Sequence, residues 1–317
     1  MFANLVYRIF SHFPFLEVLV RHFYWLILKG RNKRFFNNSK KISTTVSNFD
    51  FSDITNYLKS HSIGNGTTLV VHSSYDSLKF SGLRPNQIND ALLSLVGNDG
   101  NVVMPVNRVF SSDYRSRMRE PIERIDTFDP NLTRVTTGAL GYMLMKNPNS
   151  TISLHPISNA VVIGAMSEWF VSENISGILP RPCGVGSVWS KCVEVDAVIV
   201  ALGTDLVHSL TMTHIVEDMF HDDWPIKNWY NERTFKIVVG SEIVTKTVLE
   251  RKPYWGKLYY AESSFRKDLV ANGILLSTLV SGLSVEVIRT KPLIDFLISK
   301  NKHGYPFRFV PKKFYKL

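Results

Sequence analysis

Four short apolar runs, each followed by small or polar residues, constrain the fold of this 317-residue chain most strongly. They are TTLVVHSS, NVVMPV, NAVVIGA and VDAVIVALG, at residues 67–74, 101–106, 159–165 and 195–203. Apolar runs of this length, bounded by turn residues, are typical of strands buried within a sheet. Helical spacing between the early runs predicts an α/β fold, with a mixed β-sheet flanked by helices.

Helices and a hairpin are predicted around these strands. Helical spacing occurs in the segments 51–60, 84–96, 136–148, 269–280 and 292–300. The segment TFKIVVGSEIVTKTVLE, which ends at Glu250, alternates apolar and polar residues on both sides of Gly240 and Ser241, which predicts a β-hairpin. No composition change marks a boundary between 49 and 300, so we expect one domain at 46–317 after a separate extension at 1–45.

The positive charge of the chain is concentrated at its two ends. Eight of the 37 Lys and Arg residues lie in 1–45 against one acid, Glu17, and five more lie in 301–317, where no acid occurs. The residues between the ends carry a slight net negative charge, although the formal charge of the whole chain is +10. This distribution argues against nucleic-acid binding by the body and predicts terminal segments that contact an anionic partner.

The basic N-terminal extension is also apolar and aromatic, but charged and polar residues interrupt it. Arg8, Pro14, Glu17 and Arg21 keep each apolar run below the ~18 residues that a membrane-spanning helix requires. No small-residue cleavage site follows, which argues against a signal peptide. Two interpretations stay open: an amphipathic segment in peripheral contact with the membrane, or a helical extension packed on the domain or on the second subunit of a homodimer.

The two cysteines, Cys183 and Cys192, are too few for a disulfide framework or a cysteine metal site. The expected location is therefore the reducing cytoplasm, with peripheral contact to the inner face of the membrane if the extension binds lipid. Cys183 lies near two glycines and is a candidate reactive thiol, although a free cysteine more often serves as apolar packing.

The stretch LTMTHIVED, residues 210–218, follows the fourth apolar run and places a histidine and a glutamate three residues apart. If the stretch begins a helix, Thr211, His214 and Glu217 share one face. Open α/β sheets bind ligands beyond the carboxyl ends of their strands, where this stretch falls. There His214 can act as a base near neutral pH, oriented by Glu217, while Thr211 donates a hydrogen bond to a developing oxyanion.

A structural role for the same residues is the alternative. Thr211 would cap the helix, His214 would be a half-buried histidine with satisfied hydrogen bonds, and Glu217 would complement the helix dipole. A zinc site is a weaker alternative, because the H-E-x-x-H pattern and further ligands are not evident in the sequence. We therefore expect no metal cofactor.

Further motifs occur in a fixed order before this stretch. They are V-H-S-S at 71–74, V-M-P at 103–105, F-D-P at 128–130, T-G-x-L-G at 137–141 and S-x-H-P at 153–156, with T-x-x-H-x-x-E at 211–217 as the last. In this order and at these spacings they resemble the aminoglycoside 3-N-acetyltransferase family over about residues 50–225. The C-terminal third resembles the family only in general character, and the extension does not resemble it.

The resemblance implies a mixed α/β fold that binds acetyl-CoA and moves its acetyl group to an amine of a sugar. It implies that His214 is the base, that Glu217 orients it or holds the amine, and that Thr211 lies close to the thioester carbonyl. The residues implied to lie along CoA are His72, Ser73, Ser74 and Ser77. The residues expected to contact the substrate are His155, Asp129 and Asp218.

The implied reaction fits the residue types. An amine must lose a proton to attack a thioester, and the oxyanion that forms needs a donor, so direct transfer requires no covalent enzyme intermediate. Because the body lacks the strong negative charge that attracts a polycation, we favour an amino sugar of a surface polysaccharide as acceptor over an aminoglycoside antibiotic. An alternative function of a different class is that of a non-catalytic, membrane-associated scaffold with the same fold.

Some positions depart from the family pattern, and these departures bear on sugar specificity and CoA contacts more than on the reaction class. The departing residues are Lys79, Ile152, Ser158, Asn159 and Val188.

Overall fold

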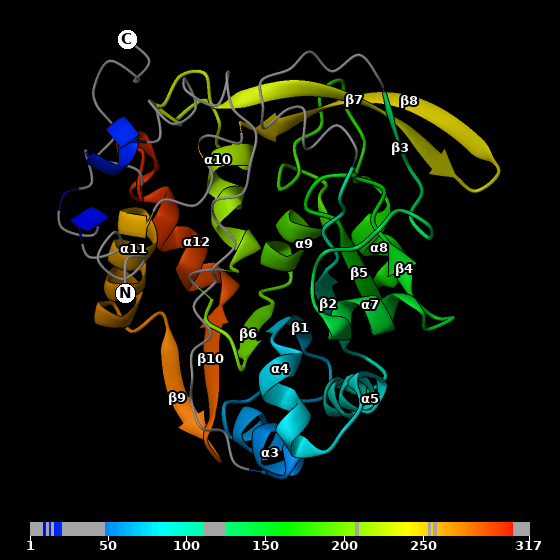
Figure 1. The fold of residues 1–317 in the computed structure, drawn as a ribbon, viewed down its shortest axis with the longest axis vertical. Coiled ribbons are helices and arrows are strands. Elements are labelled where there is room, and N and C mark those ends of the chain that lie inside the picture. Colours follow the sequence, from blue (N-terminus) through cyan, green and yellow to red (C-terminus); the bar gives the residue numbers. More distant parts are fainter. Residues whose placement is uncertain are drawn as a thin grey trace.

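A seven-stranded mixed sheet with the strand order β4-β5-β2-β1-β6-β10-β9 forms the centre of the fold (Figure 1). The computed structural model describes residues 9, 10, 13, 16–20, 48–110, 125–206, 209–252, 255 and 259–306. Strand β1 is parallel to its neighbours β2 and β6, and the other pairs are antiparallel, so the predicted mixed sheet is confirmed. The strands are β1 Thr68–Ser73, β2 Asn101–Pro105, β4 Thr151–Ile152, β5 Ala160–Gly164, β6 Val198–Leu202, β9 Leu276–Val280 and β10 Leu283–Arg289.

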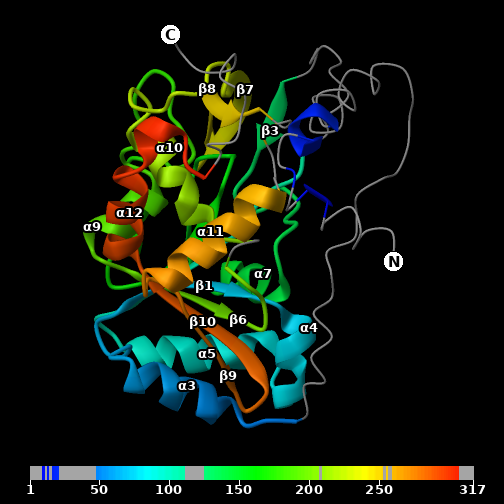
Figure 2. The same cartoon turned by 90° about the vertical axis from the view of Figure 1, so that its left-hand side faces the viewer.

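Helices cover both faces of this sheet (Figure 2). Leu69 and Val71 of β1 pack on one face against α3, α5 and α7, whereas Val70 packs on the other face against α8 to α12. A strand covered on both faces is apolar at nearly every position, which explains the continuous apolar runs of the sequence. The helices are α3 Phe51–Ser60, α4 Tyr75–Leu78, α5 Pro85–Val96, α7 Ala139–Met145, α8 Ser167–Val171, α9 Val188–Glu194, α10 Ile215–Met219, α11 Tyr259–Ala271 and α12 Thr290–Ile298.

A second, three-stranded sheet lies beyond one end of the main sheet (Figure 1). It consists of β3, Asp126–Phe128, and the hairpin of β7, Tyr230–Val239, with β8, Glu242–Arg251. Gly240 begins the hairpin turn with a φ of 61°, so the predicted hairpin is confirmed. The buried guanidinium of Arg233 lies 3.1 Å from Asp126 and 3.1 Å from Glu250, and this ion triad joins the three strands.

The helix predicted at 269–280 is wrong. Helix α11 ends at Ala271, Gly273 follows with a φ of 66°, and 276–280 form the edge strand β9. Leu276, Leu279 and Val280 have helical spacing in the sequence, but hydrogen bonding to β10 fixes them in an extended strand. An edge strand with mostly exposed side chains lacks the alternation that identifies a half-buried strand.

Most of the basic extension at 1–45, together with 111–124 and 307–317, lies outside the described residues. Its predicted contact with a membrane or a second subunit therefore stays a prediction. Among the residues that the structure describes, no helix is long and apolar enough to cross a membrane.

The loops that follow β1 and β6 are joined closely. The Ser74 amide donates to the Leu202 carbonyl at 3.0 Å, and the Ser77 hydroxyl donates to the Gly203 carbonyl at 3.1 Å. Gly203 has a φ of 68°, and a Cβ built on it would lie 2.5 Å from the Cβ of Ser77. The absence of a side chain at Gly203 thus lets the two loops approach each other.

We predict that Gly203→Ala lowers the free energy of unfolding more than Gly282→Ala does. Gly282 also has a positive φ, of 82°, but a Cβ there meets no atom within 4 Å, so its substitution adds only backbone strain of about 1 kcal/mol. The contact with Ser77 should add ~1–3 kcal/mol at Gly203. Urea unfolding measures both values. Equal losses in the two variants would contradict the close approach of the loops, and Ser77→Gly should partly restore Gly203→Ala.

Candidate active site

The polar residues of the sequence motifs converge at one edge of the main sheet. Because β1, β2 and β6 are parallel, their carboxyl ends lie together, and antiparallel β5 begins at the same edge. The Val106 amide donates to the Asn159 carbonyl at 2.7 Å, and the Thr137 hydroxyl donates to the Pro105 carbonyl at 3.0 Å. This edge is where open α/β sheets bind ligands.

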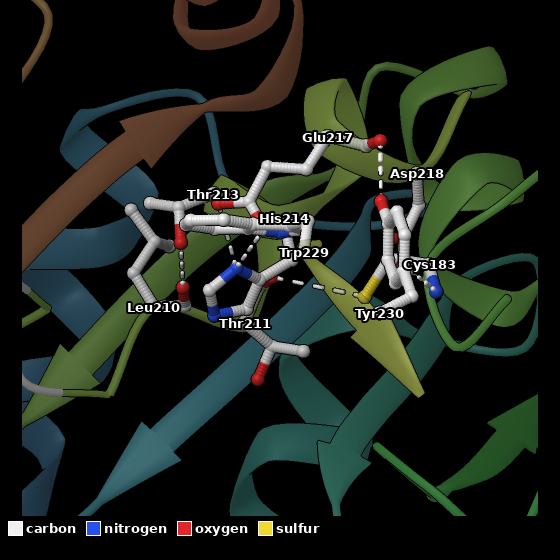
Figure 3. Close-up of polar contacts among 9 residues, drawn as sticks. All are labelled: Cys183, Leu210, Thr211, Thr213, His214, Glu217, Asp218, Trp229 and Tyr230. Carbon is white, nitrogen blue, oxygen red and sulfur yellow. Dashed lines mark hydrogen bonds and ion pairs between the residues drawn. The ribbon is translucent and has the colours of Figure 1, made fainter. Parts of the chain in front are cut away.

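The chain after β6 forms a 3₁₀ turn, Thr211–His214, that continues directly as α10. The first turn therefore differs from the continuous α-helix considered for this stretch. Leu210 holds the N-cap position, and the hydroxyl of Thr213 donates to its carbonyl at 2.8 Å, so Thr211 is not the cap. Side chains three residues apart eclipse each other in a 3₁₀ turn, which places Thr211 beneath the imidazole of His214 (Figure 3).

His214 and Glu217 form a close pair. The Nδ1 atom of His214 lies 3.2 Å from each carboxylate oxygen of Glu217. The histidine side chain is 28% exposed, whereas the glutamate side chain is 3% exposed. A proton on Nδ1 satisfies the carboxylate and leaves Nε2 as an acceptor, and Figure 3 shows this second nitrogen on the side of the ring away from Glu217. Nε2 has no hydrogen-bond partner in the described part of the chain.

The Glu217 carboxylate is ionised although it is buried. Burial alone would raise its pKa, but the charge and hydrogen bond of His214, the nearby Arg251 and a hydrogen bond from Trp229 lower the pKa below its ordinary value. The indole Nε1 of Trp229 donates to Oε2 at 3.0 Å. An ionised carboxylate beside Nδ1 can stabilise a protonated imidazole, so the pair can act as a general base.

Asp218 lies next to this pair and is buried. Its Oδ2 accepts from the Cys183 amide and its Oδ1 from the Tyr230 hydroxyl, both at 2.8 Å. Burial and the charge of Glu217 raise the pKa of Asp218 to about 6. Asp218 is therefore a buried, hydrogen-bonded group, and its predicted contact with substrate stays a prediction.

The thiol of Cys183 is a packing group. It is fully buried, its Sγ lies 3.9 Å from the Thr211 carbonyl, and burial raises its pKa well above the ordinary value. A protonated, buried thiol is a poor nucleophile, so the structure favours the packing interpretation over a reactive cysteine.

The residues predicted to lie along CoA lie at the end of β1 and the start of α4. His72 is 3% exposed, burial lowers its pKa to about 4, and its Nε2 has no hydrogen-bond partner among the described residues. Ser73 and Ser74 are half-buried, and the Ser77 hydroxyl already donates to Gly203. Their contact with CoA stays a prediction.

His155 and Asp129 both have local partners. The Nδ1 of His155 lies 3.1 Å from the Ile157 amide, its Nε2 lies 3.4 Å from the Pro180 carbonyl, and burial lowers its pKa to about 4. Oδ1 of Asp129 accepts the amides of the two residues that follow Pro130, which closes a turn. The contact of His155 and Asp129 with substrate stays a prediction.

Trp229 and Tyr230 lie outside the sequence motifs and are not among the residues predicted for the site. The structure places them against α10, where they donate to Glu217 and Asp218. The signal that could have found them is chemical: two adjacent carboxylates behind a buried strand need donors, and a Trp-Tyr pair nearby in the chain can supply them.

No group of three or more His, Cys, Asp or Glu side chains in the described ranges could hold a metal ion.

We predict that the folded state loses stability as the pH falls from about 6.5 to about 4. Burial keeps His72 and His155 neutral in the folded state with pKa values of about 4, whereas the unfolded chain binds their protons near pH 6.5. Each histidine should contribute a slope of about 1.4 kcal/mol per pH unit within this window. Urea unfolding at a series of pH values measures the slope.

Asp218 supplies a control of opposite sign. Its folded pKa of about 6 lies above the ordinary value of 3.8, so its contribution to stability is present at low pH and is lost as the pH rises through about 6. Asp218→Asn should therefore steepen the increase of stability between pH 4 and 6, and His155→Gln should flatten it. Identical slopes in the wild type and both variants would contradict the burial of these groups.

Comparison with known proteins relates this chain to one family. A family model described as aminoglycoside 3-N-acetyltransferase matches residues 70–300. AAC-IIIb in a binary complex with CoASH superposes with a TM-score of 0.64 at 18% identity, covering 81% of this chain and 98% of that chain. Aminoglycoside acetyltransferase AAC(3)-Xa gives a TM-score of 0.66 at 18% identity over 81% and 93% of the two chains.

Sisomicin-bound AAC-VIa has a TM-score of 0.65 at 17% identity and covers 81% of this chain and 98% of its own. At such identities the likeness shows a shared fold. The family match spans most of the sequence and includes the His214–Glu217 pair. The chain therefore belongs to the aminoglycoside 3-N-acetyltransferase family and is an acetyl-CoA-dependent N-acetyltransferase.

Proposed function

We propose that this enzyme acetylates an amine of an amino sugar by direct transfer from acetyl-CoA, with His214 as the general base. The observation that carries the proposal is the pairing of His214 Nδ1 with the buried Glu217 carboxylate at 3.2 Å, at the edge where the parallel strands end. This pairing leaves Nε2 as the proton acceptor on the more exposed side chain of the two.

The proposed roles follow from this geometry. His214 accepts the proton that the amine loses as its nitrogen bonds to the acetyl carbon; the carbon–sulfur bond breaks, and the proton leaves with the CoA thiol. Ionised Glu217 stabilises the imidazolium that forms and keeps the imidazole in one orientation. The hydroxyl of Thr211, which lies beneath the imidazole (Figure 3), is proposed to donate to the oxygen that develops charge.

The end of β1 suits the pantetheine arm of CoA. His72 is neutral because its pKa is about 4, and its buried Nε2 is unpaired in the described part of the chain. A neutral imidazole with an unpaired nitrogen fits an uncharged partner such as an amide. We propose that His72, Ser73, Ser74 and Ser77 hold this arm, with backbone groups of the joined loops beside them.

Charges at the site favour an amino sugar with an anionic carrier, such as a nucleotide sugar used for a surface polysaccharide. Glu217 and Asp218 are buried and bound by protein donors, so in the described residues they do not form the free acidic wall that a polycation requires. Arg181 lies 5.4 Å from the Tyr230 ring, and Arg251 pairs with Tyr230 in the hairpin, so two cations flank the carboxylates.

An aminoglycoside antibiotic is the second candidate acceptor. The family match favours it, because the matched family is described by that activity and the superposed AAC-VIa binds sisomicin. The two candidates differ in charge, because an aminoglycoside is a polycation, whereas a nucleotide-linked amino sugar carries a pyrophosphate. The same assay with different acceptors therefore separates them.

We predict that His214→Ala abolishes CoA thiol release with acetyl-CoA and the accepted amine, because the substitution removes the proposed acceptor of the amine proton. The panel should contain UDP- and dTDP-linked amino sugars and sisomicin. His61→Ala is the matched control, since His61 follows α3 on the opposite face of the sheet, and it should retain wild-type turnover. Full activity of His214→Ala, or no thiol release by the wild type with any acceptor, would refute the proposed function.

A further inference from the structure

We infer that the indole N–H of Trp229 is a positioning group for the base, because it fixes the carboxylate that orients His214. The catalytic part of this inference rests on the function proposed above. Trp229 itself does not touch the imidazole; it acts through Glu217.

The Glu217 carboxylate has two side-chain donors in the described structure. His214 Nδ1 lies 3.2 Å from both of its oxygens, and Trp229 Nε1 donates to Oε2 at 3.0 Å. The glutamate side chain is 3% exposed, so little water is available to replace either donor. Trp229 therefore supplies the donor that does not belong to the reacting imidazole.

Trp229 is itself held rigidly. It is 2% exposed, its ring stacks on Trp255 at 5.2 Å between centroids, and the edge of the Trp224 ring packs against it at 4.9 Å. The next residue, Tyr230, donates through its hydroxyl to the Glu217 carbonyl at 2.6 Å. Trp229 and the first residue of β7, Tyr230, thus bind the side chain and the backbone of the same glutamate (Figure 3).

Fixing the carboxylate has a chemical consequence for His214. Nδ1 lies 3.2 Å from both oxygens, so its proton is shared between two contacts that are longer than the Trp229 bond. The Trp229 N–H donates to Oε2 at 3.0 Å and opposes rotation of the carboxylate away from Nδ1–H. A buried acid that holds the Nδ1–H tautomer keeps Nε2 free to accept a proton, as in hydrolytic triads.

Trp229→Phe tests this role, with Trp255→Phe as the matched control. Both substitutions keep a stacked aromatic ring and remove one indole N–H. The Trp255 N–H donates to the Asn228 carbonyl at 3.3 Å and does not bind Glu217. Each variant loses one hydrogen bond, so the two should have similar urea midpoints of unfolding. A difference in activity between them then reports on Glu217 rather than on folding.

We expect Trp229→Phe to lower kcat by about tenfold or more with little change in KM, because a hydrogen bond to a charged carboxylate is lost while substrate contacts remain. Trp255→Phe should retain the kcat of the wild type. Kinetics with acetyl-CoA and the best acceptor of the panel give both values. Equal kcat in the two variants would overturn the inference.

A second readout is independent of any acceptor. Nitrogen-15 chemical shifts of the histidine ring, measured on the full chain, report which nitrogen of His214 carries the proton. We expect the Nδ1–H tautomer in the wild type and in Trp255→Phe, and a mixture of both tautomers in Trp229→Phe. An unchanged tautomer in Trp229→Phe would also overturn the inference. Failure of the proposed function would instead appear as an active His214→Ala variant.

Discussion

The arrangement of the site depends on two adjacent carboxylates, those of Glu217 and Asp218, which are buried in α10 after strand β6. An isolated carboxylate in the protein interior is strongly unfavourable, so Glu217 and Asp218 must each receive donors from the protein. Glu217 is bound by His214 and Trp229, and Asp218 is bound by the Cys183 amide and Tyr230. The proposed base His214, the hairpin and the loop before α9 are joined through these two side chains.

The sheet topology explains why these donors meet. Three neighbouring parallel strands end at one edge, and their loops carry the polar residues of the sequence motifs. The hairpin of the second sheet begins with Tyr230, directly after Trp229, and both residues contact the same edge from the C-terminal part of the chain. The segment that follows the last sequence motif therefore supplies groups that hold the His214–Glu217 pair.

Much of this arrangement could be predicted from the sequence, because the evidence for it is local. The buried strands appear as apolar runs, the turn of the hairpin appears at Gly240, and the spacing of His214 and Glu217 places them together on one helical face. Contacts between segments could not be predicted in the same way. The hydrogen bond from Trp229 to Glu217 joins residues on either side of an irregular segment that has no periodicity. The edge strand β9 has helical spacing in the sequence, and only its pairing with β10 identifies it as a strand.

In the proposed reaction the negative charge of Glu217 makes His214 a base, and the turnover of Glu217→Gln measures how much that charge contributes. Glutamine keeps the size of the side chain and can still accept from Trp229, but it lacks the negative charge that stabilises the imidazolium. We expect a kcat at least ~100-fold below the wild type, with a nearly unchanged KM for acetyl-CoA, because the buried acid partner of the histidine base is neutralised. A kcat within twofold of the wild type would contradict this role of the charge.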